Sequence, residues 1–190
     1  MKNERERKFK VPSDYWEMML RRSNGVFEKI SDYFIESLTQ GPPLRFRIVE
    51  KDLSSSYSHL DLGESPQIWP RPDSQVAAIK IGYGRDRKES EYNNDDLAIP
   101  PNFGDIRLFK SRNPWIEGHL HFHVETYHRR ETFIESLPMS GNFIAEVEAE
   151  DSPEGLKALI EFVPFSDWIE VTEDDRFKSY NIAKFGWPKE

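Results

Sequence analysis

Apolar and charged residues alternate along several stretches of this chain with a period of two. In residues 44–50, Leu44, Phe46 and Ile48 alternate with Arg45 and Arg47. Successive side chains of a β-strand point to opposite faces, so this pattern predicts a strand with one apolar and one charged face. From such patterns and the turn residues between them, we predict strands at residues 1–11, 26–36, 44–50, 76–84, 86–94, 105–112, 118–128 and 142–150.

Three other stretches predict helices, at residues 12–25, 152–163 and 174–186. Ser13 or Asp14 is expected to cap the first helix. Ser152 is expected to cap the second, with Pro153 at its first helical position. Gly186 is expected to end the last helix, because glycine readily adopts the left-handed conformation found after helix ends.

The order of these elements predicts an α+β fold dominated by antiparallel strands. A chain of 190 residues without an internal repeat is expected to form a single domain, residues 1–190. Residues 52–75 are rich in Ser, Pro and Asp and predict a long loop. The helices are expected to cover the apolar faces of the strands.

The charged faces of the predicted strands carry like charges at alternate positions. Glu4 and Glu6 share one face with Lys8, and Glu146 shares a face with Glu148. Two interpretations stay open. The charged side of the sheet could simply face water, or the sheet could close into a barrel whose charged faces line the interior. We prefer the barrel, because neighbouring like charges cost stability unless opposite charges or metal ions meet them.

Composition narrows the classes of function. The net charge of −8 argues against general coating of nucleic acid. The chain has no cysteine, which excludes disulfides and cysteine-ligated zinc. It has no long apolar run and no leader-like opening, so we expect a cytoplasmic protein that does not enter a membrane.

The charged motifs, taken in order, resemble those of the CYTH domain of the triphosphate tunnel metalloenzymes. "ERERK" at residues 4–8 is similar to the E-x-E-x-K strand that begins that family, and "RFR" at residues 45–47 is similar to its R-x-R. The other similar motifs are "SDYF" (31–34), "IKIGYGRDRKESE" (79–91), "KSR" (110–112), "FHVETY" (122–127), "AEVEAE" (145–150) and "VTEDDRFKSYNIA" (171–183). The likeness covers essentially the whole chain.

The resemblance implies an eight-stranded antiparallel β-barrel with helices packed outside and a triphosphate-containing small molecule bound inside. Mg²⁺ or Mn²⁺ would be held by Glu4, Glu6, Glu146 and Glu148. The substrate-binding residues would be Arg45, Arg47, Lys80, Arg87, Lys110 and Arg112, and Lys184 is added as a phosphate contact on the last predicted helix. Catalytic roles are assigned to Lys8, Glu89, Glu91 and Glu125, the glutamates orienting the attacking water or a second ion.

These residue types suit that chemistry. A triphosphate carries about four negative charges, and arginine can bind phosphate oxygens through two donors at once. Mg²⁺ and Mn²⁺ prefer oxygen ligands such as carboxylates. A water molecule positioned by metal could attack the terminal phosphorus in line while basic side chains stabilise the other oxygens. We therefore expect metal-dependent hydrolysis of a triphosphate, with inorganic tripolyphosphate as the substrate.

The chain departs from the family pattern at two neighbouring positions. His123 stands where the family often has an acid, and Glu125 stands in place of an Asp. A rival interpretation follows from the histidines, since His119, His121 and His123 share a strand face and H-x-H can bind zinc or iron in a hydrolase or lyase. No second histidine-bearing strand supports that interpretation.

The identity of the substrate and the class of function are open to different interpretations as well. A class IV adenylyl cyclase or a thiamine or nucleoside triphosphatase would need a pocket for an organic group, and only Tyr57 and Trp69 in residues 52–75 are candidates for stacking on a base. The chain could also be a non-catalytic module that binds polyphosphate or nucleotide, because fold does not fix function. A homodimer is an oligomeric state that the sequence allows.

Overall fold

The computed structural model describes residues 2–23, 27–35, 44–52, 74–83, 86–93, 106–128 and 143–189. Within these ranges the strands are β1 (Lys2–Val11), β2 (Phe27–Ile35), β3 (Leu44–Asp52), β4 (Ser74–Tyr83), β5 (Asp86–Asn93), β6 (Ile106–Glu117), β7 (Leu120–His128), β8 (Phe143–Ala149) and β9 (Ile169–Glu170). The helices are α1 (Trp16–Arg22), α2 (Pro153–Glu161) and α3 (Ser179–Phe185), with short 3₁₀ turns η1 (Ser13–Tyr15) and η3 (Asp175–Phe177).

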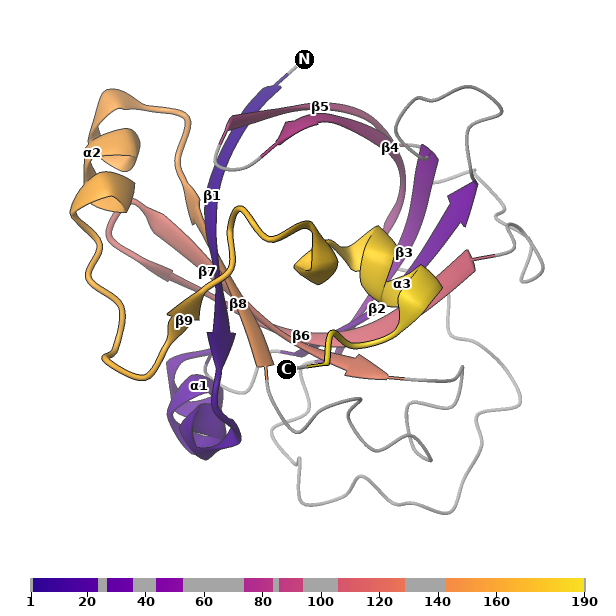
Figure 1. Ribbon diagram of the computed structural model, residues 1–190. Helices are drawn as coiled ribbons and strands as arrows, with labels where there is room; N and C mark the ends of the chain where they lie inside the picture. Colours follow the sequence, from indigo (N-terminus) through magenta and orange to yellow (C-terminus); the bar gives the residue numbers. More distant parts are fainter. Residues whose placement is uncertain are drawn as a thin grey trace.

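The strands form one antiparallel sheet in the order β5-β4-β3-β2-β6-β7-β8-β1-β9. Strand β1 divides its length between partners, because residues 2–5 pair with β5 and residues 6–11 pair with β8. The strand at one end of the order therefore also lies beside β1, and Figure 1 shows the strands curving around a common axis. The α+β class and the antiparallel sheet predicted from the alternating pattern are confirmed.

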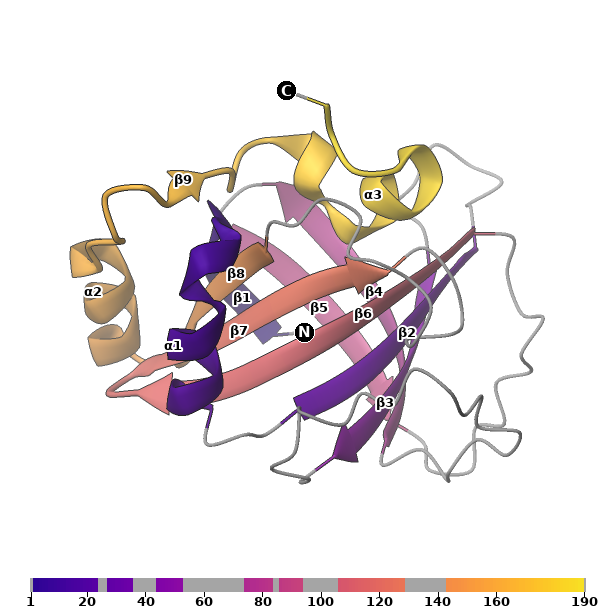
Figure 2. The same cartoon turned by 90° about the horizontal axis from the view of Figure 1, so that it is seen from below.

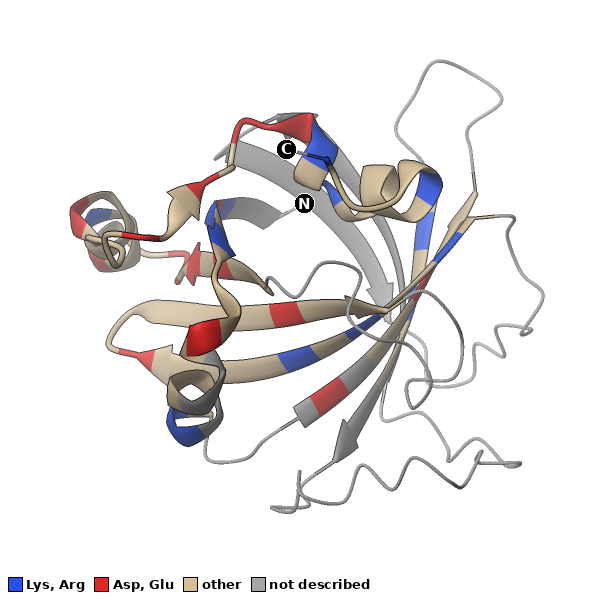
Figure 3. Ribbon diagram, turned by 60° about the horizontal axis from the view of Figure 1, so that its bottom comes forward, with Lys and Arg blue, Asp and Glu red and all other residues tan. Residues whose placement is uncertain are grey.

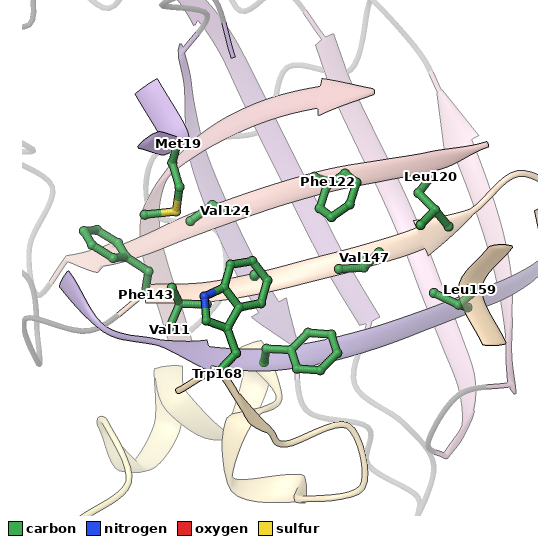
Figure 4. Close-up of a cluster of buried hydrophobic side chains, with 11 residues drawn as sticks. Val11, Met19, Leu120, Phe122, Val124, Phe143, Val147, Leu159 and Trp168 are labelled. Atoms are coloured by element: carbon green, nitrogen blue, oxygen red, sulfur yellow. The ribbon is translucent and has the colours of Figure 1, made fainter. Parts of the chain in front are cut away.

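The apolar faces of β1, β7 and β8 form a buried cluster with two helices. Phe9 of β1, Phe122 of β7 and Val147 of β8 pack with Met19 of α1 and Leu159 of α2. Figure 4 shows labelled members of this cluster gathered over the sheet, and Figure 2 shows both helices beside these strands. Each fully buried side chain of this size stabilises the fold by about 1.5–3 kcal/mol. Helices α1 and α2 thus cover the apolar face, as the pattern predicts. The expectation that the helices pack outside is wrong for α3, which packs on residues that share their strand faces with Lys110, Glu125 and Glu146.

A second buried cluster lies where α3 crosses the sheet. Ile182 of α3 and Phe177 of η3 pack on Leu108 of β6, Tyr127 of β7 and Ile144 of β8. Figure 1 places α3 across the ring of strands, and Figure 2 places it at one end of the sheet. The C-terminal segment is therefore fixed to the sheet by apolar contacts.

The helix ends differ from the predicted ones in two places. The prediction that Ser13 or Asp14 caps the first helix is wrong, because these residues form the turn η1 and Tyr15 takes the N-cap position without a side-chain hydrogen bond. The helix predicted at 174–186 is broken at Lys178, whose extended backbone separates η3 from α3.

The remaining predicted helix features agree with the structure. The Ser152 hydroxyl accepts a hydrogen bond from the Gly155 N–H at 2.9 Å, with Pro153 at the first position of α2. Gly186, with φ of 83°, ends α3. The loop predicted at 52–75 lies outside the described residues, except for the strand ends at Asp52 and residues 74–75. No helix in the described ranges combines the length and apolar character needed to span a membrane.

Candidate active site

Glu125 of β7 is the centre of a buried group of ion pairs. Its carboxylate lies 2.7 Å from Lys110 Nζ and accepts hydrogen bonds from Arg112 Nε at 2.9 Å and Nη2 at 2.6 Å. Tyr127 donates to the same carboxylate at 2.9 Å. The hairpin of β6 and β7 positions these side chains, since its register sets Arg112 opposite Glu125 and Lys110 opposite Tyr127. Lys110 and Arg112, two residues apart on β6, therefore contact the same carboxylate as Tyr127 of β7.

Asp32 of β2 is a second buried carboxylate. It receives Arg47 Nε at 2.7 Å and Nη2 at 3.0 Å, a two-point contact between directly opposed residues of β2 and β3. Lys110 Nζ lies 3.6 Å from Asp32 and so joins this pair to the group at Glu125. Two-point contacts fix the direction of a guanidinium as well as its position.

Glu146 of β8 extends these contacts to β1. Arg112 Nη2 lies 3.6 Å from Glu146, and Lys8 Nζ lies 2.7 Å from it. Lys8 Nζ is also 4.0 Å from Glu6 on the same face of β1. Glu6 and Lys8 are buried rather than solvated, so the charged face of β1 does not simply face water.

The contacts form one continuous series, which we call the ion-pair chain. It crosses six neighbouring strands in the order β3, β2, β6, β7, β8 and β1, and Figure 3 shows acidic and basic positions side by side on the described part of the sheet. Its members are Arg47, Asp32, Lys110, Glu125, Arg112, Glu146, Lys8 and Glu6. Removing these charges from water is costly unless each is paired, so the pairing explains how the fold tolerates them.

The surroundings shift the pKa values of Asp32, Lys110 and the neighbouring Tyr127. Burial alone would raise the pKa of Asp32, but the positive charges of Arg47 and Lys110 outweigh it and hold that pKa well below its usual range. Burial lowers the pKa of Lys110 to about 8, against the opposing charge of Glu125. The pKa of Tyr127 is raised by burial and by Glu125, so the phenol stays protonated and can donate.

A group of metal-ligand type lies beside the end of the ion-pair chain. One ligand atom each from His123, Glu146 and Glu148 lies within 4.8 Å of the others, and we call these residues the carboxylate–histidine group. Adjacent strands position them, because His123 of β7 is opposite Glu146 of β8 and Glu148 is opposite Glu6 of β1. Two carboxylates and one imidazole fit a divalent cation.

The structure brings most of the predicted site residues together. The ion-pair chain contains Glu6, Lys8, Arg47, Lys110, Arg112, Glu125 and Glu146, and Glu148 lies in the adjoining group. Arg45 is buried on β3 and adds its positive charge to the field at Asp32. Lys184 is exposed on α3, with Nζ over the rings of Tyr180 and Phe185.

Five predicted residues have side chains outside the described part of the structure. The backbone register places Glu4 of β1 opposite Arg87 of β5, and Lys80 of β4 opposite Glu89 of β5. Glu91 lies on β5 opposite Ala78. Their roles stay predictions.

Sequence reasoning did not assign site roles to Asp32 and Tyr127. Asp32 lies in the "SDYF" motif. That motif was used only as part of the family resemblance, and no role was given to its aspartate. Tyr127 could have been found from its spacing, since it stands two residues after Glu125 and shares that strand face. His119 and His121 contact Glu150 at 2.8 and 3.9 Å, whereas His123 contacts Glu148 at 3.5 Å, so these described contacts divide the three histidines between two carboxylates.

Comparisons by sequence found no matching family model and no matching curated protein. Solved structures are similar in fold. The crystal structure of the hypothetical protein NE1496 aligns with a TM-score of 0.50 and 17% identity over 95% of this chain and 96% of that chain. A structure described as the inorganic triphosphatase NE1496 aligns with a TM-score of 0.49 and 18% identity over 94% of this chain and 95% of that chain.

A chain in the structure of the Schizosaccharomyces pombe Mediator head module also aligns, with a TM-score of 0.55 and 10% identity over 83% of this chain and 89% of that chain. At these identities the likeness is one of fold. The CYTH-like fold predicted from the order of motifs is supported by the likeness to NE1496. Because proteins of quite different description share the fold, it does not by itself fix the function.

Proposed function

We propose that this chain, which has a CYTH-like fold, is a divalent-metal-dependent triphosphatase that hydrolyses inorganic tripolyphosphate inside a barrel closed by the pairing of β1 with β5. The ion-pair chain carries the proposal, because it places arginine and lysine side chains on the same strand faces as a carboxylate group suited to metal. NE1496 is described as an inorganic triphosphatase. The likeness to it is one of fold, so the proposal rests on the charged side chains.

The basic members of the ion-pair chain would bind the phosphates while keeping their carboxylate partners. Arg47 and Arg112 each use Nε and Nη2 for a carboxylate. A guanidinium has five N–H donors, so Nη1 of each can serve a phosphate oxygen without loss of the carboxylate that orients it. Lys110 and Arg45 add positive charge on the strand faces that carry Arg112 and Arg47. Lys80 and Arg87 complete the proposed phosphate contacts from β4 and β5, and Lys184 stays a predicted contact.

Glu6, Glu146 and Glu148 would hold the divalent ion, with Glu4 as a further predicted ligand. When bound, Mg²⁺ or Mn²⁺ supplies Lewis-acid polarisation of a phosphoryl oxygen and lowers the pKa of a coordinated water. Lys8 lies 2.7 Å from Glu146 and would stabilise charge that develops on the phosphate. Glu89 and Glu91 are proposed to orient the attacking water.

Glu125 is proposed to act mainly by positioning. Its carboxylate accepts hydrogen bonds from Lys110, Arg112 and Tyr127, so it holds two phosphate-binding cations in place. This arrangement needs no covalent intermediate, since positioning and electrostatic stabilisation supply most of the catalysis in phosphoryl transfer.

A second candidate function is a module that binds triphosphate without turnover. It is favoured by the balance of charge in the ion-pair chain, where four basic side chains meet four carboxylates. A polyanion has to compete with those carboxylates, which can limit its approach to the reactive geometry. A cytoplasmic location, a single domain spanning 1–190, a homodimer and the absence of bulk nucleic-acid binding stay predictions from the sequence.

One assay separates the candidates. The chain is incubated with tripolyphosphate, ATP and thiamine triphosphate in separate reactions with Mg²⁺ or Mn²⁺, and the products are identified. Orthophosphate plus pyrophosphate from tripolyphosphate is expected, and chelation should abolish it until metal is added back. Cyclic AMP plus pyrophosphate from ATP would establish the cyclase, and tight binding without turnover would establish the binding module. Turnover that survives exhaustive chelation would exclude the metal mechanism.

A further inference from the structure

We infer that His123 is a ligand of the divalent ion and that it makes the site select Mn²⁺ over Mg²⁺. The inference rests on the proposed function for the existence of the metal site. It goes further by naming a nitrogen ligand where the proposed site has only oxygen ligands, and by naming the ion.

The first support is the position of the imidazole. His123 lies opposite Glu146 in the register of β7 and β8, and one of its ring nitrogens lies within 4.8 Å of ligand oxygens of both Glu146 and Glu148. The side chain is 18% exposed, so it faces the interior rather than bulk water. A cation at the carboxylates would therefore have the imidazole within its coordination sphere after small side-chain movements.

The second support is the state of Nδ1. This atom is buried and has no hydrogen-bond partner among the described residues. It lies 3.5 Å from Glu148 Oε1, close enough for electrostatic contact but without hydrogen-bond geometry. Buried polar atoms of side chains are normally satisfied, so an unsatisfied nitrogen beside two carboxylates indicates a missing partner. A metal ion held by the two carboxylates would satisfy this nitrogen as well.

The neighbouring histidines do not share these properties. His119 is 54% exposed and His121 is 39% exposed, and both contact Glu150 instead of the carboxylate–histidine group. Of the histidines on this strand face, His123 is thus the one that the structure places at the group. His121 is two residues away on the same strand and provides a matched control.

The ligand types determine the selectivity. Mg²⁺ prefers oxygen ligands and a nearly ideal octahedron, whereas imidazole binds first-row transition ions better. One nitrogen and two carboxylates therefore favour Mn²⁺ over Mg²⁺, although an all-carboxylate site would accept both. Replacing His123 by an acid should reduce the difference between the affinities for Mn²⁺ and Mg²⁺.

The test measures binding and needs no turnover. Mn²⁺ is added to the full chain without a histidine tag, and pulsed electron paramagnetic resonance records whether an imidazole ¹⁴N is coupled to the bound ion. The ¹⁴N signal is expected in the wild type and in His121→Gln, and it should be lost in His123→Gln. In His123→Glu the Mn²⁺ should stay bound without ¹⁴N coupling, and the preference for Mn²⁺ over Mg²⁺ in competition should fall at least about tenfold.

The urea midpoint of each variant shows that the fold is intact. Bound Mn²⁺ without ¹⁴N coupling in the wild type, or an unchanged Mn²⁺/Mg²⁺ preference in His123→Glu, would overturn the inference, and so would the absence of Mn²⁺ binding. Failure of the proposed function looks different, because ¹⁴N coupling would be present while tripolyphosphate stays intact. Conversely, turnover supported equally by Mg²⁺ and Mn²⁺ without ¹⁴N coupling would retain the function and remove the role of His123.

Discussion

Asp32 and Glu125 are completely removed from water, yet their surroundings keep both carboxylates ionised. Burial raises the pKa of each, and Glu146 adds a like charge near Glu125. The cations Arg47, Lys110 and Arg112 outweigh these effects, so the net shift of both pKa values is downward. Such a carboxylate is a fixed negative charge throughout the neutral range, which suits it to hold arginine and lysine in place for a ligand.

The Asp32→Asn variant should be destabilised by about 3–5 kcal/mol at pH 7, because it leaves the Arg47 guanidinium buried without its counter-ion. A carboxylate with a lowered folded-state pKa contributes stability that is present above its unfolded pKa of about 4 and is lost as pH falls. The difference between wild type and variant should therefore shrink below about pH 4. Urea unfolding at pH 7, 5 and 3 measures it.

Asp175→Asn is the control for this prediction. Asp175 is an exposed carboxylate paired with Lys178 at 2.6 Å, and its loss should cost less than about 1 kcal/mol. Equal costs for the two variants, or a cost for Asp32→Asn that does not change with pH, would contradict the account of Asp32.

The Glu148→Gln variant tests the proposed metal ligands through turnover. It preserves size and removes one charged oxygen ligand, so hydrolysis of tripolyphosphate should fall at least about tenfold while stability changes little. Glu146→Gln and Glu6→Gln are expected to lower turnover in the same way. Glu146→Gln should also destabilise the fold, because it leaves buried Lys8 without the carboxylate that lies 2.7 Å away. Glu150→Gln, which removes the partner of His119 instead, should leave turnover near that of the wild type. Near-normal turnover in the three variants at Glu148, Glu146 and Glu6 would assign these glutamates to structure alone.

At the scale of elements, the alternating pattern was sufficient for the longer strands and insufficient for the short pieces. Each of β1 to β8 was predicted, because a half-buried strand keeps its period of two over many residues. Their ends agree within about two residues except at β6, which continues past the predicted end at Arg112 to Glu117. Strand β9 has only two residues, Ile169 and Glu170, so it has no period to detect. The break at Lys178 arises from tertiary packing of Phe177 and Ile182 on the sheet, which local helix preference does not contain.

Gly155 in the first turn of α2 gives a prediction at this scale. Replacing glycine by alanine inside a helix usually stabilises by about 1 kcal/mol. Here an added Cβ would collide with the backbone oxygen of Glu150, which cannot move as a flexible side chain could. Gly155→Ala should therefore destabilise the chain by about 1–3 kcal/mol in urea unfolding. The exposed Lys157→Ala on the same helix should change stability by less than about 0.5 kcal/mol, and a stabilised Gly155→Ala would contradict the packing argument.

At the scale of the whole molecule, a contact between two site residues was predictable only when their strands are joined by a hairpin. Arg112 opposite Glu125 follows from the hairpin, since the turn at Gly118 and His119 sets Glu117 opposite Leu120 and fixes every pair before it. The contact of Arg112 with Glu146 has no such local rule. It joins strands that are not neighbours in the sequence, so motifs could name the charged residues but not their partners.

Ligand binding should stabilise the entire fold. A ligand that binds only the folded state raises the free energy of unfolding by about 2.7 kcal/mol at one hundred times its dissociation constant. Tripolyphosphate is expected to produce a rise of this kind in urea unfolding when a chelator is present to prevent its metal-dependent hydrolysis. Orthophosphate under the same conditions at matched ionic strength is the control and should produce much less, because it reaches fewer of the basic side chains. Equal stabilisation by both anions would indicate nonspecific anion binding.

The divided pairing of β1 also has a consequence for how the chain folds. Arg7 of β1 bonds Glu170, which is 163 residues further along, and β8 is likewise near the far end of the chain. Contacts of such separation require the closure of a long loop, so they slow folding and delay the completion of β1 during synthesis. Until β5, β8 and β9 have been synthesised, β1 has no partner strands. During that time its alternating charges discourage pairing with other chains, as charged side chains do on exposed strand edges. Glu4, Glu6 and Lys8 of β1, which are proposed to serve metal binding and catalysis, would then also protect the nascent protein from aggregation.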